Sequence, residues 1–443
     1  MNKALIKGAL AVFTGRILGL LANFGFNMVL ARQLAPDQVG YYFLLFNLIT
    51  FLAIFARFGC ENYALKAYAD AINRHRSGTI ILTRVITLII IASVGTTVIF
   101  WLASSFLFIT VFSAPSLATL TSFIIAWFVL VAFQAVQAEI LRAAGLFLKA
   151  ALVKGTLTYS LNVIVVVGLF LFDYPFNLTT VLQLVVVNAL ITSLFGFYWI
   201  MKRDRDNQDN IADKSIKDIT LLTCTAASIP LLINQAAMFI TSQSDIWLLG
   251  AFYGPEATAY YGAAARLVLL TGLALTIANG VLPPFISKLR VNNDKAKLEV
   301  LVRVVATVTA IPAVIIISLF IFYSEEILTL IFGEQYAVAS NILIILSVAQ
   351  LVNVLVGSCG YLLIMHGYNN QFMVYSLSGG AISLLLSMLA IYYGLSSIYI
   401  AIGFSSGIIV QQLMMLRGCK THVGITSHIL IKDVFNHVKS IKA

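Results

Sequence analysis

Residues 311–322 read IPAVIIISLFIF, an uncharged and almost wholly apolar stretch. Similar runs recur along the chain, for example at residues 85–91 and 163–172. A helix that crosses a bilayer needs about 20 mainly apolar residues, whereas the strands of a membrane barrel alternate apolar and polar side chains. Because these runs do not alternate, they predict α-helices that cross a membrane.

The composition indicates the same class of protein. Of 443 residues, 60% are hydrophobic and only 10% are charged, whereas soluble domains average about 45–50% apolar and about 25% charged residues. A soluble globular domain is therefore excluded, and an all-α integral membrane protein with about twelve transmembrane helices is predicted. The predicted spans are residues 8–31, 39–58, 80–108, 118–138, 149–172, 179–201, 220–250, 258–280, 300–322, 338–363, 371–393 and 395–416.

Membrane topology explains the basic charge of the chain. The 28 Lys and Arg residues exceed the 18 Asp and Glu residues, which gives a net charge of +10. If both termini are cytoplasmic, 25 of the 28 basic residues lie in cytoplasmic loops or at cytoplasmic helix ends, as the positive-inside rule requires. Nucleic acid is therefore not expected as a partner, and the expected surroundings are membrane lipid.

An internal repeat divides the predicted spans into six and six. The polar segment KRDRDNQDNIADKSIKDI occupies residues 202–219, and the motif LAPDQVGYY at residues 34–42 returns as YGPEATAYY at residues 253–261. Two parallel six-helix repeats with a substrate site near their interface are a known transporter arrangement. The predicted domains are an N-terminal bundle (1–201), a cytoplasmic linker (202–219), a C-terminal bundle (220–416) and a basic cytoplasmic tail (417–443).

Three segments resemble the Wzx-type O-antigen and polysaccharide flippases of the multidrug/oligosaccharidyl-lipid/polysaccharide (MOP) exporter superfamily. They read VLARQLAPDQVGY at residues 29–41, DIWLLG at 245–250 continued by YYGAAAR at 260–266, and LIFGEQY at 330–336. The resemblance implies a V-shaped, MATE-like bundle in the bacterial inner (cytoplasmic) membrane. It implies a flippase that moves undecaprenyl-pyrophosphate-linked oligosaccharide from the inner to the outer leaflet. A polysaccharide polymerase and a chain-length regulator are further candidate partners.

Polar residues on otherwise apolar helices are candidates for lining the substrate path. Arg16, Asn23 and Asn27 fall on one face of the first span, where a mid-membrane charge is costly unless it faces a cavity or partner. Snorkelling of Arg16 to the cytoplasmic surface is the alternative. Lys154 is followed by Thr158 and Asn162 at steps of four. The remaining path candidates are Asn234, Arg266, Gln350 and Asn353, and for the uncharged residues hydrogen bonding between helices is the alternative.

Further charged residues are candidates for gating and for substrate entrance. Asp245 could pair with Arg266 as a latch or gate, and it is the main candidate for ion coupling. Glu139 is a second such acid, although it could simply pair with Arg142 one turn away. Basic residues at cytoplasmic helix ends could attract a pyrophosphate or merely report topology: Arg57, Arg84, Arg142 and Lys149. The resemblance implies cavity roles for Arg16, Arg57 and Arg266.

Two other function classes compete with the flippase. A MATE-like multidrug antiporter that exports cations should carry acids in its cavity, which the two mid-membrane arginines contradict. A membrane polymerase or ligase should carry a large outer loop with catalytic groups, and no nucleophile and base pair, metal motif or phosphate loop is present. An enzyme, a cofactor and a metal site are therefore not expected. Gly15-x-x-x-Gly19 and Gly403-x-x-x-Gly407 predict close helix packing.

Overall fold

The computed structural model describes residues 3–73, 79–172, 176–207, 220–292 and 294–428, and every regular element within these ranges is helical. The chain forms two compact units, Met1–Phe239 and Ile240–Ala443. Their boundary falls inside one long helix, α9 (Leu221–Phe252). The domain boundary predicted at 202–219 stays a prediction, because residues 208–219 lie outside the described residues and residues 202–207 continue the preceding helix.

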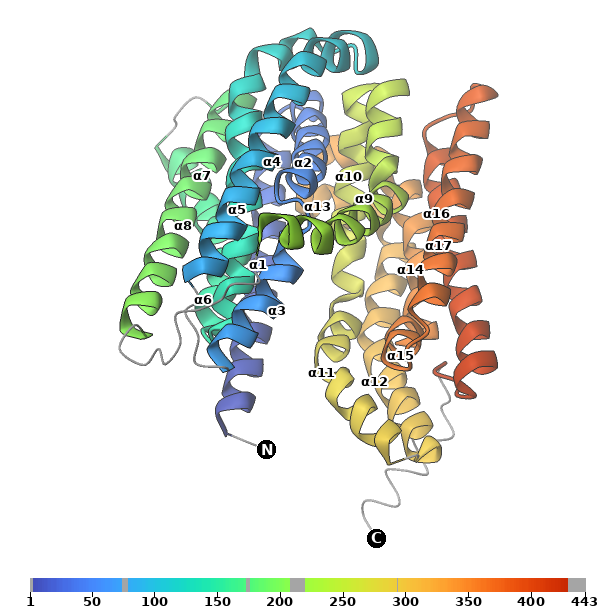
Figure 1. The fold of residues 1–443 in the computed structure, drawn as a ribbon. Coiled ribbons are helices and arrows are strands. Elements are labelled where there is room, and N and C mark those ends of the chain that lie inside the picture. The colour runs from blue at the N-terminus through green and yellow to red at the C-terminus, as the bar shows by residue number, and fades with distance from the viewer. Residues whose placement is uncertain (1–2, 74–78, 173–175, 208–219, 293, 429–443) are drawn as a thin grey trace. The chain divides into compact units, whose positions relative to one another are not determined.

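The first unit is built from long helices joined by short ones (Figure 1). Its helices before α9 are α1 (Lys3–Gln33), α2 (Pro36–Ala56), α3 (Cys60–Asn73), α4 (Thr79–Ser105), α5 (Thr121–Ala143), α6 (Phe147–Ala151), α7 (Leu157–Leu171) and α8 (Leu178–Asn207). Three single turns adjoin them, η1 (Phe106–Val111), η2 (Pro115–Leu120) and η3 (Leu152–Thr156). Helix α5 packs against α2, α3 and α8 and is therefore the central helix of this unit.

The second unit repeats the pattern of long helices with short insertions. Its helices after α9 are α10 (Gly254–Thr271), α11 (Leu273–Val291), α12 (Lys295–Phe322), α13 (Ser324–Phe332), α14 (Ser340–Val356), α15 (Cys359–Met365), α16 (Asn369–Tyr392) and α17 (Ile398–Gly418). Two short turns, η5 (Glu334–Ala339) and η6 (Cys419–Val423), adjoin α14 and α17. Helices α16 and α17 lie side by side over their whole length (Figure 1). The predicted tail (417–443) begins with the last two residues of α17 and includes η6, and its cytoplasmic location stays a prediction.

The helices account for a multi-pass membrane protein. Ten helices within the described residues are long and apolar enough to span a membrane, and the bent pair α10 and α11 would make eleven. The first predicted span lies within α1, so every predicted span has a helix at its position, although the count of twelve is not confirmed. On α4 the side chains of Ile99, Trp101 and Leu102 are 71%, 64% and 69% exposed, which suits contact with lipid tails.

Three predicted spans are interrupted at glycines, one of them the fifth span at Gly155 within η3. The eighth span is bent by 50° between α10 and α11, at Gly272. The tenth ends at Gly357, whose φ of +75° lies in the region that favours glycine. A Cβ at Gly357 would stand 2.8 Å from the Cβ of Ala306, so this close approach also requires glycine. The expectation of single continuous helices at 149–172, 258–280 and 338–363 was therefore wrong.

The internal repeat corresponds to a repeated helix start. Pro36 and Pro255 both occupy the first turn of a helix, where proline is well tolerated because its missing N–H would have no helical partner. Asp37 and Glu256 follow in the same first turns, where a negative charge favours the helix dipole. The repeated motif thus begins the second helix of the first unit and the corresponding helix, α10, of the second.

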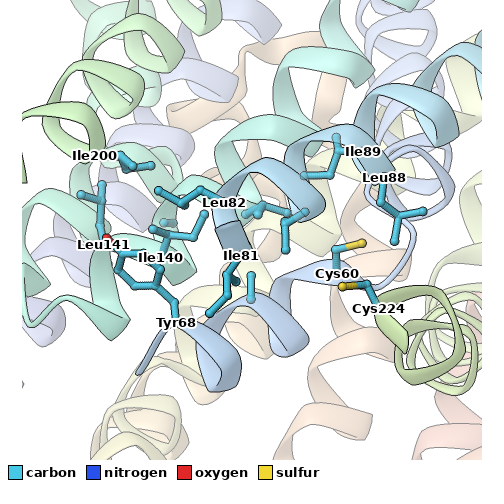
Figure 2. Packing of buried hydrophobic residues seen from close by; sticks show 14 of the residues in the cluster. Cys60, Tyr68, Ile81, Leu82, Leu88, Ile89, Ile140, Leu141, Ile200 and Cys224 are labelled. Atoms are coloured by element: carbon cyan, nitrogen blue, oxygen red, sulfur yellow. The ribbon is translucent and has the colours of Figure 1, made fainter. Parts of the chain in front are cut away.

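A buried cluster fixes the short amphipathic helix α3 against α4 and α5 (Figure 2). Tyr68 of α3 packs among Ile81 and Leu82 of α4 and Leu141 of α5. Helix α3 is not among the candidate spans. The cluster therefore joins a helix that does not span the membrane to the first unit's central helix.

Candidate functional site

A distorted turn in the fifth span sets the position of Lys154. Between α6 and α7 the chain forms the π-helical turn η3, in which Gly155 has φ of +135°. Turns of this kind inside helices are frequent at functional sites. The ring of Tyr159 lies 2.9 Å from where a Cβ of Gly155 would stand, so the turn is closed on this side. The distortion directs Lys154 toward α5, which a regular helix through residues 149–172 does not predict.

An ion cluster links η3 to the central helix α5. The Nζ of Lys154 donates to Glu139 Oε1 at 2.7 Å, and Arg142 Nη1 lies 3.0 Å from Glu139 Oε2. The Glu139 side chain is only 6% exposed, whereas those of Lys154 and Arg142 are 55% and 38% exposed. A buried carboxylate thus holds two cations that remain accessible. The pairing of Glu139 with Arg142 was the alternative considered to a role of Glu139 in ion coupling, whereas the contact with Lys154 was not considered.

The two cations line a cavity inside the first unit. Its volume is about 350 Å³, within the range of small-molecule sites. The lining residues are Gly19, Leu20, Asn23, Ala138, Arg142, Phe147, Ala150, Ala151, Lys154, Gly155, Thr156 and Tyr159. Three of the predicted site residues, Asn23, Arg142 and Lys154, therefore share one cavity. Its two cations outnumber its one neighbouring acid, which favours an anionic ligand.

Helix α1 forms the opposite wall through the predicted glycine motif. A Cβ on Gly15 would stand 2.6 Å from Ala151 Cβ, and one on Gly19 would stand 3.1 Å from Thr156 Oγ1. Thr156 Oγ1 also donates to the carbonyl oxygen of Gly15 at 2.7 Å. The prediction of close packing is confirmed here. It is also confirmed at Gly403 and Gly407, where α17 meets α16.

The predicted polar stripe of α1 is only partly described. Asn23 lines the cavity, and Asn27 is buried one turn further on, with its Nδ2 donating to Asn23 Oδ1 at 3.1 Å. The backbone of Arg16 is part of α1, but the structure does not describe the Arg16 side chain. The position of the Arg16 guanidinium relative to the cavity therefore stays a prediction.

Of the predicted stripe Lys154, Thr158 and Asn162, the first lines the cavity and the other two bond to a neighbouring helix. Thr158 donates to Thr192 at 3.0 Å, and Asn162 Oδ1 accepts from Asn188 Nδ2 at 2.8 Å. Thr192 and Asn188 belong to α8, so these two polar residues join α7 to α8 as hydrogen-bonding helix partners. Lys154 alone reaches the cavity, because η3 interrupts the helical phase before Thr158.

The remaining candidates for substrate entrance differ in their surroundings. Arg57, directly after α2, lies 3.0 Å from Glu61 and donates to Gln235 at 2.8 Å. Lys149 lies over the ring of Trp199, 5.7 Å from its centroid. Arg84 is exposed on α4. None of these three lines the cavity of the first unit, which leaves Arg142 as the entrance candidate that does.

In the second unit, Asp245 has a partner that was not predicted. Its Oδ2 accepts a hydrogen bond from the hydroxyl of Tyr261 at 2.5 Å, and its Oδ1 accepts from the Ile246 amide at 2.9 Å. Arg266 interacts with Asp245 through its charge. Tyr261 is therefore a direct hydrogen-bonding partner of Asp245, whereas direct pairing of Asp245 with Arg266 stays a prediction.

The other candidates of the second half lie on α9 and α14. Asn234 is exposed on α9. Asn353 Nδ2 donates to Gln350 Oε1 at 3.2 Å on α14, and the Gln350 amide lies against Gly272, where α10 and α11 bend. Gln350 and Asn353 therefore sit at a bend of the second unit. Within the described residues no group of three metal-ligating side chains is assembled.

Comparison with known proteins identifies the family. The family described as polysaccharide biosynthesis protein matches residues 5–290, which is more than half of the chain. The chain belongs to the polysaccharide biosynthesis protein family. A comparison with curated protein sequences finds no match for this family member.

Solved structures of MOP-superfamily transporters share the fold of this family member. An inward-facing multidrug resistance MATE family transporter is 17% identical with a TM-score of 0.75, and the match covers 94% of this chain and 98% of that one. The lipid II flippase MurJ, in an inward closed conformation, is 17% identical with a TM-score of 0.69, covering 97% and 89%. A MOP superfamily transporter from Pyrococcus furiosus is 15% identical with a TM-score of 0.64, covering 95% and 96%. The predicted all-α, MOP-type fold is confirmed.

Proposed function

We propose that the protein is a flippase for undecaprenyl-pyrophosphate-linked oligosaccharide, the repeat unit of an O-antigen or a related polysaccharide. The cavity of the first unit carries the proposal, because Arg142 and Lys154 place two cations on its wall. Membership of the polysaccharide biosynthesis family supports a saccharide-linked substrate. The pyrophosphate of such a lipid carries the negative charges that these cations attract.

Transport proceeds by alternating access from the inner to the outer leaflet of the bacterial inner membrane. The cations receive the pyrophosphate from the cytoplasmic side, and Arg16 in the first unit and Arg266 in the second are the further arginines proposed to contact the substrate during transport. An inside-negative potential assists the export of two negative charges by about 4–5 kcal/mol per 100 mV. A polymerase and a chain-length regulator would then use the exported unit.

A MATE-like multidrug antiporter is the alternative, and the MATE structures share the fold. An organic cation would be repelled by the cavity of the first unit, whose accessible side chains include Arg142 and Lys154. The two functions therefore predict opposite charge preferences for the transported molecule.

Deleting the protein from its host distinguishes the two functions. A flippase predicts that intact lipid-linked oligosaccharide accumulates in the inner leaflet and that surface polysaccharide is lost. Leaflet position is read by whether a membrane-impermeant glycosidase can reach the sugar. Unchanged glycans together with increased sensitivity to cationic drugs would instead identify an antiporter.

Complementation with variants tests the residues of the path. Arg16→Ala and Arg266→Ala should each abolish surface polysaccharide while the amount of protein in the membrane stays normal. Lys297→Ala is the control, because Lys297 is 78% exposed at the start of α12, lies outside the cavity and is not a candidate for the substrate path. Full function with alanine at both 16 and 266 contradicts their proposed role.

A further inference from the structure

We propose that the Glu139 carboxylate occupies the two cations as an anionic ligand would, and that a pyrophosphate diester with two negative charges displaces it from Arg142 and Lys154. The inference rests on the proposed function in taking this pyrophosphate as part of a lipid-linked sugar. Glu139 thereby becomes a residue that determines which anions the cavity accepts.

The geometry of the ion cluster resembles that of a bound anion. Each carboxylate oxygen of Glu139 takes one cation, Lys154 at 2.7 Å and Arg142 at 3.0 Å. The carboxylate is almost fully buried and does not line the cavity, whereas Lys154 and Arg142 line it and their side chains are 55% and 38% exposed. An anion that enters the cavity therefore contacts Arg142 and Lys154 before Glu139. It can bind both cations from the cavity side while Glu139 remains in its own position.

The count of charges favours a ligand with two negative charges. Arg142 and Lys154 together carry two positive charges, so a pyrophosphate diester balances them completely once Glu139 has let go. A ligand with a single negative charge leaves Glu139 on one of the cations, so it makes one charge-assisted contact where the pyrophosphate makes two. Because charge-assisted hydrogen bonds are about twice as strong as neutral ones, the second contact is decisive.

The displaced carboxylate has another cation nearby. Arg57 at the end of α2 interacts with Glu139 through its charge, in addition to its contact with Glu61 at 3.0 Å and its hydrogen bond to Gln235. Leaving a buried charge without any partner would be strongly unfavourable. Arg57 provides the partial compensation that makes displacement of Glu139 feasible.

The test measures anion binding to the purified full-length protein in detergent by isothermal titration calorimetry. UDP-N-acetylglucosamine serves as a soluble pyrophosphate diester with two negative charges, and diethyl phosphate serves as a diester with one. The wild-type protein should prefer the first probe. In Glu139→Gln the affinity for UDP-N-acetylglucosamine should rise about tenfold and the preference over diethyl phosphate should grow, because only the dianion has to displace the carboxylate from both cations. Unchanged or weaker binding overturns the proposal, since a purely structural acid gives no gain.

A second variant keeps the charges balanced. Glu139→Gln combined with Lys154→Gln removes one acid and one base, and it should lose the gain and bind at least about tenfold more weakly than Glu139→Gln alone. Equal affinity of the two variants overturns the role of Lys154. The matched control is Glu299→Gln, which removes an acid that lies 3.3 Å from Arg303 in the second unit. A similar gain in this control would reduce the effect to net charge and overturn the proposal.

The source of the pyrophosphate is tested in the same micelles. Radiolabelled UDP-N-acetylglucosamine is bound first. An undecaprenyl-pyrophosphate-linked sugar should then displace it at a lower concentration than unlabelled UDP-N-acetylglucosamine does. Absence of competition overturns the assignment to a lipid-linked ligand. Reconstituted vesicles separate the two proposals. Normal flipping with no gain of affinity in Glu139→Gln refutes only this inference, whereas the expected binding without any flipping refutes only the proposed function.

Discussion

The chemistry of the cavity depends on a few residues in unusual conformations. Lys154 reaches Glu139 because Gly155 adopts φ of +135° within the π-helical turn η3. Few other residues tolerate this backbone conformation. The position of Lys154 in the site therefore depends on the glycine that follows it.

Replacing Gly155 with alanine should destabilise the site. The backbone strain and the ring of Tyr159, 2.9 Å from the new Cβ, should together cost about 1–3 kcal/mol of unfolding free energy. Thermal unfolding in detergent measures the loss, and calorimetry with UDP-N-acetylglucosamine measures the accompanying loss of affinity. Gly168→Ala is the control, because Gly168 lies in α7 with no atom within 4 Å of its Cβ position. Equal effects of both substitutions would contradict the role of η3.

Sequence reasoning found the members of the cavity but not their connections. Asn23 and Lys154 were predicted because polar and basic residues are costly in apolar spans, and Arg142 because a base at a cytoplasmic helix end can attract a pyrophosphate. The contact between Lys154 and Glu139 was missed because a regular helix was assumed, and the phase of that helix changes at Gly155. Tyr261 was missed as the partner of Asp245 because contacts between helices depend on packing that one sequence does not display.

At the scale of helices, long apolar elements were predicted well and short ones were missed. Each predicted span has a helix at its position because about 20 apolar residues leave few alternatives in a bilayer. Helices α3 and α13 were missed because they are short, and α3 is too polar to be recognised as a span, whereas α15 was predicted as the end of the tenth span. Figure 2 shows how α3 is held by apolar contacts with its neighbours.

The packing of α3 against α9 predicts that the cysteines between these helices react slowly with thiol reagents. Cys60 of α3 and Cys224 of α9 are both buried, with their sulfur atoms at one end of the cluster (Figure 2). Burial raises the pKa of the Cys60 thiol to about 12. Because the thiolate is the reactive form, a rise from about 9 leaves roughly a thousandfold less thiolate at pH 8. The native protein should therefore resist labelling of Cys60 by maleimide at this pH.

A cysteine introduced on the exposed surface of α3 provides the comparison. Asp70→Cys should be labelled within minutes, since Asp70 is exposed on the same helix. After unfolding in detergent, all four native cysteines should react, which mass spectrometry of the labelled peptides would show. Native labelling of Cys60 as fast as that of the introduced cysteine would show that α3 is not fixed as described.

At the scale of the whole molecule, equivalent positions of the two units carry residues with different chemistry. Tyr42 and Tyr261 are equivalent in the repeated motif, and each is buried. Tyr42 packs edge-on against Phe26 with ring centroids 5.8 Å apart, whereas Tyr261 donates to Asp245, the residue equivalent to Phe26. One ancestral contact is apolar in the first unit and ionisable in the second.

The predicted topology can be tested with two cysteines on opposite sides. Glu256→Cys should react with a membrane-impermeant maleimide added to spheroplasts, because Glu256 is exposed and lies in a predicted outer loop. Lys202→Cys should react only after permeabilisation, because Lys202 is exposed on the predicted cytoplasmic side. The buried native cysteines keep the background low. The reverse labelling pattern would invert the topology and with it the direction of transport.

The segment after α17 completes the contacts of α12 late in the synthesis of the chain. Thr426 accepts a hydrogen bond from Arg303 at 2.6 Å and donates to Glu299 at 2.6 Å, and it follows these residues of α12 by 123 and 127 positions. At about 5–20 residues per second, the ribosome needs roughly 6–25 s to supply it. During that interval the two charged groups of α12 lack this partner, so quality-control proteases have a window in which an incomplete second unit can be recognised.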